Sequence, residues 1–167
     1  MTLSGSCLCR GVQYEIHGPI SDVYNCHCSM CRKLHAAAFR TCGRILSADW
    51  RTCSGGELIR FYESSPGEHK AFCSVCGSSL FTRFDDKPEV YGFPLGTLDT
   101  DPGVRAQKHV FVGSKAPWFE ITDDLPRHDG FGGRLPAPAG FDILIAHVTE
   151  AGTTLLRHPR GDGPIQR

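Results

Sequence analysis

Seven of the nine cysteines in this chain fall into three tight clusters. The clusters are Cys7-Leu8-Cys9, Cys26-His27-Cys28-Ser29-Met30-Cys31 and Cys73-Ser74-Val75-Cys76. Zinc binds thiolates at about 2.3 Å in a roughly tetrahedral arrangement, and a Cys-x-Cys or Cys-x-x-Cys loop offers it two thiolates at once. The clusters therefore predict a protein stapled by two zinc ions per chain, in which segments far apart in the sequence meet around the metal.

The simplest partition of the clustered cysteines makes one closed site and one incomplete site. The closed site has four ligands, Cys7, Cys9, Cys73 and Cys76. The incomplete site has three, Cys26, Cys28 and Cys31. Structural zinc normally has four protein ligands, whereas catalytic zinc has three and keeps one position for water or substrate. We therefore expect the three-cysteine site to be the catalytic one.

Three other interpretations of these cysteines remain open. A fourth protein ligand from His27, His35 or Cys42 would close the second site and make both metals structural. Disulfides would suit a small secreted protein, but residues 1–11 lack the apolar core of a signal peptide. A thioredoxin-like redox role for the last cluster needs a strand–helix context, whereas a Gly-Ser-Ser turn follows it. We favour metal binding in a reducing cytoplasm.

Composition and charge exclude several classes of protein. The chain has 167 residues, enough for one ordinary domain with a small appendage. Its 18 basic and 18 acidic residues balance, so no overall field recruits nucleic acid or an anionic membrane. No stretch approaches the roughly 18 apolar residues that a transmembrane helix needs. We expect a cytoplasmic protein that binds neither nucleic acid nor membranes.

Hydrophobic residues recur mostly with a period of two, which indicates β-strands. Val12, Tyr14 and Ile16 share one face of the first predicted strand. Further strands are predicted at 58–62, 69–72, 80–84, 90–95 and 108–112. The one predicted helix has Ser29 as its cap and residues 30–34 as its body. The pattern predicts a mainly β fold of antiparallel sheets with one short helix.

The isolated cysteines and the order of the clusters add two expectations. Cys42 follows an apolar run and is expected in the core, while Cys53 lies beside glycines and is expected in a turn. Cys9 lies more than sixty residues before Cys73, so the first metal must join the first strand to a mid-chain hairpin. Such a staple removes much unfolded-state entropy, and chelation is expected to collapse the fold as well as any activity.

Four motifs, in order, resemble the glutathione-dependent formaldehyde-activating enzymes, the GFA family. They are Gly5-Ser6-Cys7-Leu8-Cys9-Arg10-Gly11-Val12, Cys26-His27-Cys28-Ser29-Met30-Cys31-Arg32-Lys33, Phe72-Cys73-Ser74-Val75-Cys76-Gly77-Ser78-Ser79-Leu80, and His109-Val110-Phe111-Val112 with Lys115-Ala116-Pro117-Trp118 and Thr122-Asp123-Asp124-Leu125-Pro126. The resemblance runs from about residue 5 to about residue 126. It implies an Mss4-like fold, a structural zinc at the four-cysteine site and the active-site zinc at the three-cysteine site. The chain departs from the family at residues 34–36, where the family commonly has a small-residue stretch that includes glycine.

The resemblance also implies an activity, a carbon-sulfur lyase acting on a small thiol adduct. The reaction that names the family joins formaldehyde and glutathione into S-hydroxymethylglutathione, so glutathione is the expected small-molecule partner. Three thiolates donate strongly to zinc, which favours thiol chemistry over water activation. His27 or His35 is a candidate for moving the proton, because imidazole titrates near pH 6.5. The alternative function is a non-catalytic, zinc-stabilised interaction module.

Two further features have both a functional and a structural interpretation. Trp118 with Lys115 would form the wall of a pocket for an anionic thiol, or residues 115–119 would cover an open sheet edge. We favour the sheet cover, because large aromatic side chains usually serve cores. His109 is expected to be a buried strand residue rather than a catalytic one.

Composition also predicts the domain boundaries. Residues 1–127 would form the GFA-like zinc-binding domain, 128–140 a Gly/Pro-rich linker, 141–158 a C-terminal β-hairpin and 159–167 a disordered tail. A two-stranded hairpin is only marginally stable alone. It is therefore expected to pack on the main domain or on a second subunit of a homodimer.

Overall fold

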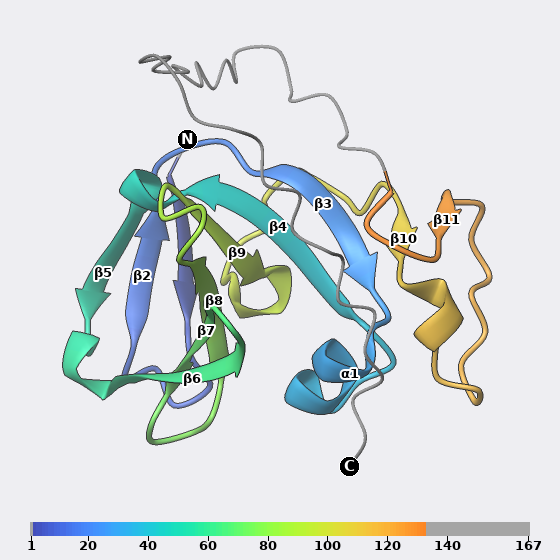
Figure 1. The fold of residues 1–167 in the computed structure, drawn as a ribbon. Helices are drawn as coiled ribbons and strands as arrows, with labels where there is room; N and C mark the ends of the chain where they lie inside the picture. The colour runs from blue at the N-terminus through green and yellow to red at the C-terminus, as the bar shows by residue number, and fades with distance from the viewer. Residues whose placement is uncertain (1, 133–167) are drawn as a thin grey trace, which may run out of the picture.

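The structure, a computed structural model, describes residues 2–132. Within them lie two β-sheets and one α-helix, α1 (Ser29–His35) (Figure 1). The smaller sheet has the order β1-β2-β5, with β1 at Leu3–Ser6, β2 at Gln13–Ile16 and β5 at Trp50–Ser54. The mainly β fold with one short helix is therefore confirmed.

The larger sheet has eight strands in the order β11-β10-β3-β4-β9-β8-β7-β6. Their bounds are β3 Ser21–Cys26, β4 Arg40–Leu46, β6 Ile59–Ser65, β7 Glu68–Cys73, β8 Ser79–Phe84, β9 Val90–Pro94, β10 His109–Val110 and β11 Arg127–His128. Short 3-10 helices lie at Ser47–Asp49, Gly56–Leu58, Leu95–Thr97 and Val112–Ser114. The long strands pair antiparallel, but β10 pairs parallel with both β3 and β11.

Residues of both sheets form one hydrophobic core. The predicted inward face of the first strand is confirmed, because Val12, Tyr14 and Ile16 are all buried. Gln13, which lies between Val12 and Tyr14, is exposed. The Tyr14 ring stacks on Trp50 of β5 with 3.9 Å between ring centroids, and Trp50 in turn contacts Phe81 of β8. These contacts hold the small sheet against one end of the large one.

Only some of the strands of the large sheet were predicted from the sequence. The predictions for β6, β7, β8 and β9 agree with the structure to within three residues at each end. The predicted strand at 108–112 shrinks to His109–Val110, and β3 and β4 were not predicted. Both β3 and β4 lie inside the large sheet and carry runs of buried residues, so they lack the polar–apolar alternation of a half-exposed strand.

The predicted helix is present, but its cap differs by one residue. Cys28 rather than Ser29 is the N-cap, and its Sγ accepts a hydrogen bond from the Cys31 amide at 3.3 Å. The helix ends at His35, and its C-cap Ala36 adopts the left-handed conformation with φ of 48°. A sulfur atom that caps the helix is thus one of the proposed metal ligands.

The two isolated cysteines have different outcomes. Cys42 is buried as predicted, in a second small core with Tyr24, Cys26 and Val110. Cys53 was predicted in a turn, but it lies exposed in β5. The prediction failed because the turn glycines begin only two residues later, at Gly55.

Gly55 closes the turn after β5 against the loop before β2. Its φ is 71°, and an added Cβ would lie 2.0 Å from the Gly11 carbonyl oxygen. Because both backbone conformation and space exclude a side chain, we expect Gly55→Ala to lower the free energy of unfolding by about 2 kcal/mol or more in thermal denaturation. Gly96→Ala is the control, since nothing lies within 4 Å of the added Cβ there. Equal stability of the two variants would contradict this account.

Residues 2–132 contain no helix long and apolar enough to cross a membrane. The predicted C-terminal hairpin at 141–158, the tail at 159–167 and most of the linker at 128–140 lie outside the described residues. The expected homodimer stays a prediction, as does the packing of the hairpin.

Candidate metal centres and cavity

The four-cysteine cluster joins two loops from the two sheets. Cys7 and Cys9 lie between β1 and β2, while Cys73 ends β7 and Cys76 lies in the turn before β8. All four sulfur atoms lie within 4.8 Å of one another. The Sγ–Sγ distance is 3.4 Å for Cys7–Cys9 and 3.9 Å for Cys9–Cys73, near the roughly 3.8 Å expected for tetrahedral thiolates around zinc. The cluster could hold a metal ion, and its geometry is compatible with zinc.

Backbone hydrogen bonds shape both loops of this cluster. The Val12 amide donates to Cys7 Sγ at 3.2 Å, which aims a positive dipole at the sulfur. In the second loop the Gly77 amide donates to the Cys73 carbonyl, and Gly77 has a φ of 74°. The Leu8 amide donates to Ser78 Oγ at 2.9 Å and joins the two loops directly. The fold thus preorganises sulfur atoms that are 64 residues apart.

The three-cysteine cluster lies where β3 leads into α1. Cys26 ends β3, Cys28 caps the helix, and Cys31 lies in its first turn. The three sulfur atoms also lie within 4.8 Å of one another, so this cluster could hold a second ion. All nine cysteines are within the described residues and all are free, so the alternative of disulfides has no support in the structure.

Hydrogen bonds between the thiols leave one of these three sulfurs far easier to ionise than the others. Hydrogen bonds from Cys26 and Cys31 lower the pKa of Cys28 to about 2. The pKa of Cys26 is raised by its hydrogen bonds to Cys28 and Cys31 and by burial. For Cys31, the hydrogen bond with Cys26 lowers the pKa. The hydrogen bond with Cys28 and burial outweigh it and raise the pKa of Cys31 to about 11. Because zinc binds thiolates, metal binding at this cluster would release the protons that the thiols still hold.

The candidates for a fourth ligand do not join this cluster. In residues 2–132, no further His, Cys, Asp or Glu donor lies within 4.8 Å of all three sulfur atoms. Cys42 lies on β4 beside the cluster, and His35 is at the far end of α1. His27 is fully buried between two cluster cysteines, but its ring bonds to His109 instead. One side of the cluster is thus left without a protein donor from this part of the chain.

His27, His109 and Asp123 form a hydrogen-bonded chain behind the cluster. His27 Nε2 lies 2.7 Å from His109 Nδ1, and His109 Nε2 lies 3.0 Å from an Asp123 carboxylate oxygen. Because the carboxylate can only accept, His109 donates to Asp123 from Nε2, and its Nδ1 shares a hydrogen bond with His27 Nε2. Burial and the neighbouring His109 lower the pKa of His27 to about 4, so His27 is neutral near pH 7. The expected buried position of His109 is confirmed.

The hydrogen bond with His109 holds the side chain of His27, the residue between Cys26 and Cys28, and so helps to fix the segment that carries these two cysteines. Removing a residue that helps to orient metal ligands typically lowers the metal affinity by about 10–100-fold. We therefore expect His109→Phe to weaken metal binding at the three-cysteine cluster by about that factor, measured by competition with a chromophoric chelator. His69→Phe is the matched control, because His69 also bonds an aspartate, Asp85, but belongs to neither cluster. Equal metal affinity of the two variants would remove His109 from this role.

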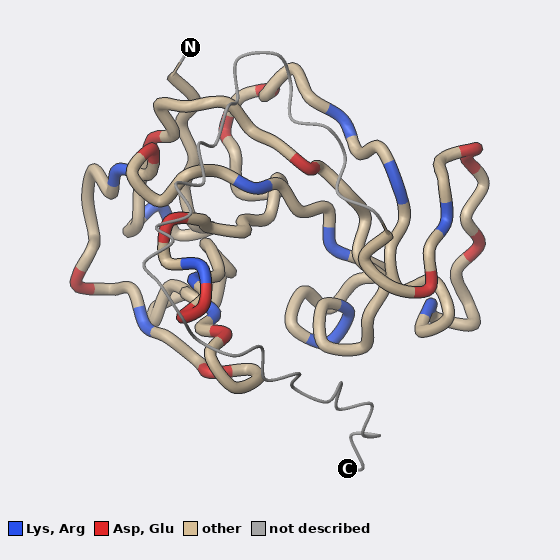
Figure 2. Tube along the Cα trace, turned by 45° about the horizontal axis from the view of Figure 1, so that its top comes forward, with Lys and Arg blue, Asp and Glu red and all other residues tan. Residues whose placement is uncertain are grey.

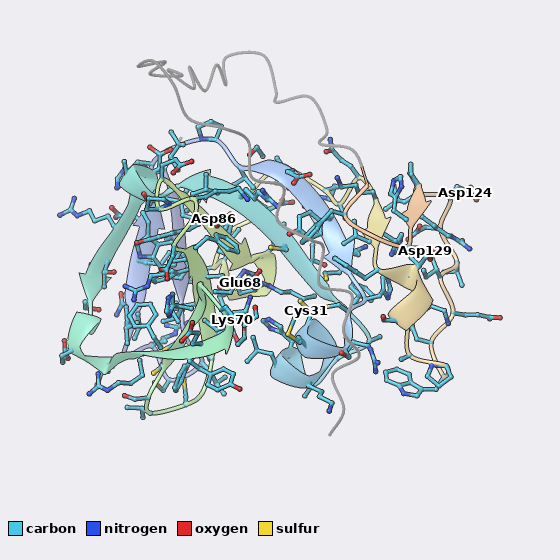
Figure 3. The ribbon with its side chains drawn as sticks, viewed as in Figure 1. Cys31, Glu68, Lys70, Asp86, Asp124 and Asp129 are labelled. Carbon is cyan, nitrogen blue, oxygen red and sulfur yellow. The ribbon has the colours of Figure 1, made fainter. Side chains whose placement is uncertain are left out.

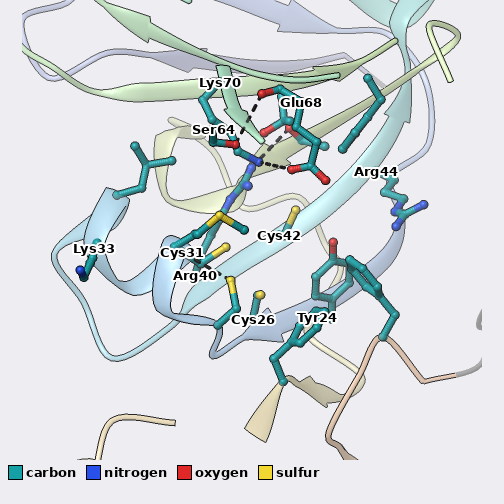
Figure 4. Close-up of a pocket in the computed structure, with 18 of the residues that line it drawn as sticks. Tyr24, Cys26, Cys31, Lys33, Arg40, Cys42, Arg44, Ser64, Glu68 and Lys70 are labelled. Carbon is teal, nitrogen blue, oxygen red and sulfur yellow. Dashed lines mark hydrogen bonds and ion pairs between the residues drawn. The ribbon is translucent and has the colours of Figure 1, made fainter. Parts of the chain in front are cut away.

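A cavity of about 480 Å³ lies beside the three-cysteine cluster (Figure 4). All three cluster cysteines contribute to its wall. Apolar and aromatic side chains form most of the rest, from Tyr24, Met30, Leu34, Tyr62, Phe84, Phe111 and Phe131. The charged residues in the wall are Lys33, Arg40, Arg44, Glu68 and Lys70. The incomplete side of a metal site thus meets a space large enough for a small peptide-like molecule.

Most of the charges in the cavity wall are paired. Lys70 Nζ lies 3.0 Å from Glu68, and both come from β7 to face the region of Cys31 (Figure 3). Arg44 Nε lies 3.3 Å from Asp22. Over the rest of the described chain, basic and acidic residues are interspersed on both sheets (Figure 2). The cavity wall contains four basic residues and one acidic residue, so it is locally positive although the whole chain has no net charge.

Several residues weighed from the sequence do not line the cavity. His27 and His35, the candidate proton carriers, are absent from its wall. Lys115 and Trp118 are absent too, since Lys115 Nζ donates to the carbonyls of Ala116 and Phe119 and Trp118 is 72% exposed. Trp118 is therefore no part of the cavity wall, while Ala116 of the same segment is buried and Phe119 packs on Phe39. The predicted covering of a sheet edge by residues 115–119 stays a prediction.

The sequence missed the residues of β4 and β7 that line the cavity, above all Arg40 and Lys70. Arg40 pairs with Cys26 across β3 and β4, a register that only the folded sheet brings about. A signal was nevertheless present in the sequence, because Arg40 interrupts the mostly apolar stretch 36–42, where a charged residue is unusual without a partner or a function.

A comparison with protein families matches residues 2–114 to the model described as glutathione-dependent formaldehyde-activating enzyme, GFA. The chain belongs to the GFA family. The resemblance of its cysteine motifs is thereby confirmed. Among curated proteins, none matches this GFA family member. Among solved structures, a Rhodobacter sphaeroides protein is similar, with 26% sequence identity over 62% of this chain and 91% of that chain and a TM-score of 0.47.

Proposed function

We propose that this GFA family member is a zinc-dependent carbon-sulfur lyase acting on a small thiol adduct of the S-hydroxymethylglutathione type. One observation carries the proposal: the cluster that lacks a fourth protein donor within the described residues forms part of the wall of a cavity of about 480 Å³. A purely structural site has no need of an incomplete ligand set facing a cavity. The reducing conditions of the cytoplasm would keep its thiols free to bind metal.

The donor sets fit two zinc ions per chain. Cys7, Cys9, Cys73 and Cys76 would hold a structural ion, and Cys26, Cys28 and Cys31 would hold the ion at the active site. Zinc in the three-cysteine site would supply a Lewis-acidic position that lowers the pKa of a substrate thiol at the mouth of the cavity. Three thiolate ligands moderate that acidity, which suits a thiol better than water.

The cavity supports a peptide-like thiol such as glutathione as substrate. Its aromatic wall, with Tyr24, Tyr62 and Phe111, offers apolar surface to the peptide backbone and the thiol-bearing carbon. Lys33 at the rim and Lys70 within the wall offer cationic partners for carboxylates. These groups would hold the thiol with its sulfur toward the cluster, and closely held reactants gain effective concentration.

The reaction needs no redox partner. A lone pair on the thiol sulfur forms a bond to the aldehyde carbon, and the C=O π pair moves onto oxygen. The proton lost by the thiol is returned to that oxygen through solvent, which yields the hydroxymethyl thioether. Lyase action is the reverse, in which the C–S bond breaks and the carbonyl re-forms.

The direct test combines metal analysis with turnover. We expect two zinc ions per chain and accelerated exchange between formaldehyde plus glutathione and their adduct, followed by NMR exchange spectroscopy. Cys53→Ser is the matched control, because Cys53 is an exposed cysteine outside both clusters and should leave metal count and rate unchanged. Full metal loading without acceleration for any small thiol and aldehyde would instead favour the non-catalytic interaction module.

A further inference from the structure

Arg40 is a buried cation in the wall of the cavity. Only 7% of the residue is exposed, and it lines the same cavity as Cys26 and Cys31. Its Nη2 donates to the Gly92 carbonyl at 3.3 Å, while its Nε is buried and has no hydrogen-bond partner. A buried donor without a partner is costly, so the guanidinium of a residue in the cavity wall has hydrogen-bonding capacity that the described residues leave unused.

The other cations of the wall are less suited to this task. Lys70 is paired with Glu68 and Arg44 with Asp22, while Lys33 is exposed on α1. Within residues 2–132 no carboxylate forms an ion pair with Arg40. The electrostatic partners of its guanidinium include the thiols of Cys42, Cys31 and Cys26, and Figure 4 shows Arg40 beside Cys31. Arg40 is therefore the cation that lies beside the reactive cluster and still has a donor to offer.

We propose that Arg40 is a catalytic residue whose guanidinium hydrogen-bonds the aldehyde oxygen as that oxygen becomes negatively charged. This inference rests on the proposed function. As the thiol sulfur bonds to the aldehyde carbon, the C=O π pair localises on oxygen, and Arg40 stabilises that charge without giving up its own proton. In the reverse direction Arg40 stabilises the same oxygen until its electron pair re-forms C=O and the C–S bond breaks.

The position of Arg40 suits this role. Its backbone pairs with that of Cys26 across β3 and β4, which ties the guanidinium to the cluster through a sheet rather than a loop. The oxygen is bonded to the carbon that the sulfur attacks, so its donor must lie close to the sulfur-binding face of the cluster. Donors held rigidly at such a position typically contribute about 10²–10³-fold to turnover.

Arg40→Lys is the decisive variant, since it keeps the charge but removes the planar donor group. We expect it to retain two metal ions and to lose about 100-fold in kcat, with KM changed by less than about threefold. Arg40→Ala should lose at least as much and recover part of the loss with added guanidinium ion. Arg105→Gln is the control, because Arg105 is an exposed arginine paired with Asp101 outside the cavity, and its kcat should equal that of the parent.

Two results with these variants would overturn the inference. Arg40→Lys with kcat within about threefold of the parent would mean that the positive charge alone matters. Loss of the second metal ion from Arg40→Lys would mean that Arg40 serves the metal site and not the aldehyde oxygen.

A binding measurement separates this inference from the proposed function. Glutathione sulfonate carries anionic oxygens on the sulfur, where the reacting oxygen would lie, and its affinity can be measured by calorimetry without turnover. We expect the parent to bind it at least about tenfold more tightly than Arg40→Lys, and Arg105→Gln to match the parent. Equal affinity for the parent and Arg40→Lys, or no binding to the parent, would overturn the role of Arg40. A parent that binds the sulfonate through Arg40 but catalyses no carbon-sulfur reaction would refute the proposed function alone.

Discussion

Removing the metal ions is expected to unfold the domain. The four-cysteine cluster joins the β1–β2 loop to the β7–β8 turn, and it closes a loop of 64 residues between Cys9 and Cys73. Structural zinc contributes on the order of 10–16 kcal/mol in small zinc-binding peptides, comparable to the whole stability of an ordinary domain. We expect a strong chelator, or Cys73→Ser, to abolish the cooperative thermal transition and the β-sheet circular dichroism.

The control for this result is Cys53→Ser. Both cysteines lie at or near strand ends, but Cys53 is exposed and outside the clusters, whereas Cys73 is fully buried within one. Cys53→Ser should keep two metal ions and the parent melting temperature to within about 2 °C. A metal-free protein with a sharp transition near that of the parent would show that the core alone specifies the fold.

Replacing Cys28 by serine is expected to abolish turnover and leave the fold. Cys28 is one of the three sulfur donors gathered within 4.8 Å in the three-cysteine cluster, so its loss leaves that site with two cysteine ligands. Serine is among the best N-cap residues, and its hydroxyl oxygen can accept the hydrogen bond from the Cys31 amide that Cys28 Sγ accepts in the parent. We expect the metal count to fall from two to one, the rate to fall to that without protein, and the free energy of unfolding to drop by only about 1–3 kcal/mol.

Cys42→Ala is the comparison for metal count. Cys42 is a buried cysteine in the wall of the same cavity, but its sulfur is not part of the cluster. This variant should keep both ions, measured by elemental analysis of purified protein. Loss of the second ion from Cys42→Ala, or retention of both ions by Cys28→Ser, would assign the ligands differently.

The sequence predicted the cysteine clusters and the half-exposed strands because both depend on local spacing. A Cys-x-Cys or Cys-x-x-Cys loop can offer two thiolates to one metal ion from a single short segment. Alternating residues such as Tyr14 and Ile16 in β2 reveal their inward face for the same local reason. The GFA family could also be recognised in this way, since its motifs lie within short segments.

The strands that surround the three-cysteine cluster were not predictable from local spacing. β3 and β4 lie inside the sheet, where covering on both sides removes the alternating pattern. His27 illustrates the same limit, because its neighbours in sequence suggested a ligand or proton carrier, whereas its bond to His109 depends on the parallel pairing of β10 with β3. Long-range pairing decides where such side chains point.

By itself the sequence determined which sulfur atoms gather, because each loop supplies its ligands within three to six residues. Only the tertiary structure decided what lies beside them. The cavity takes its wall from β3, α1, β4, β6, β7, β8 and β9, and Arg40 lies beside Cys31 in that wall. Side chains from strands so far apart in the sequence meet only when the sheet forms, since the cost in chain entropy of bringing them together is met by burial of the whole core.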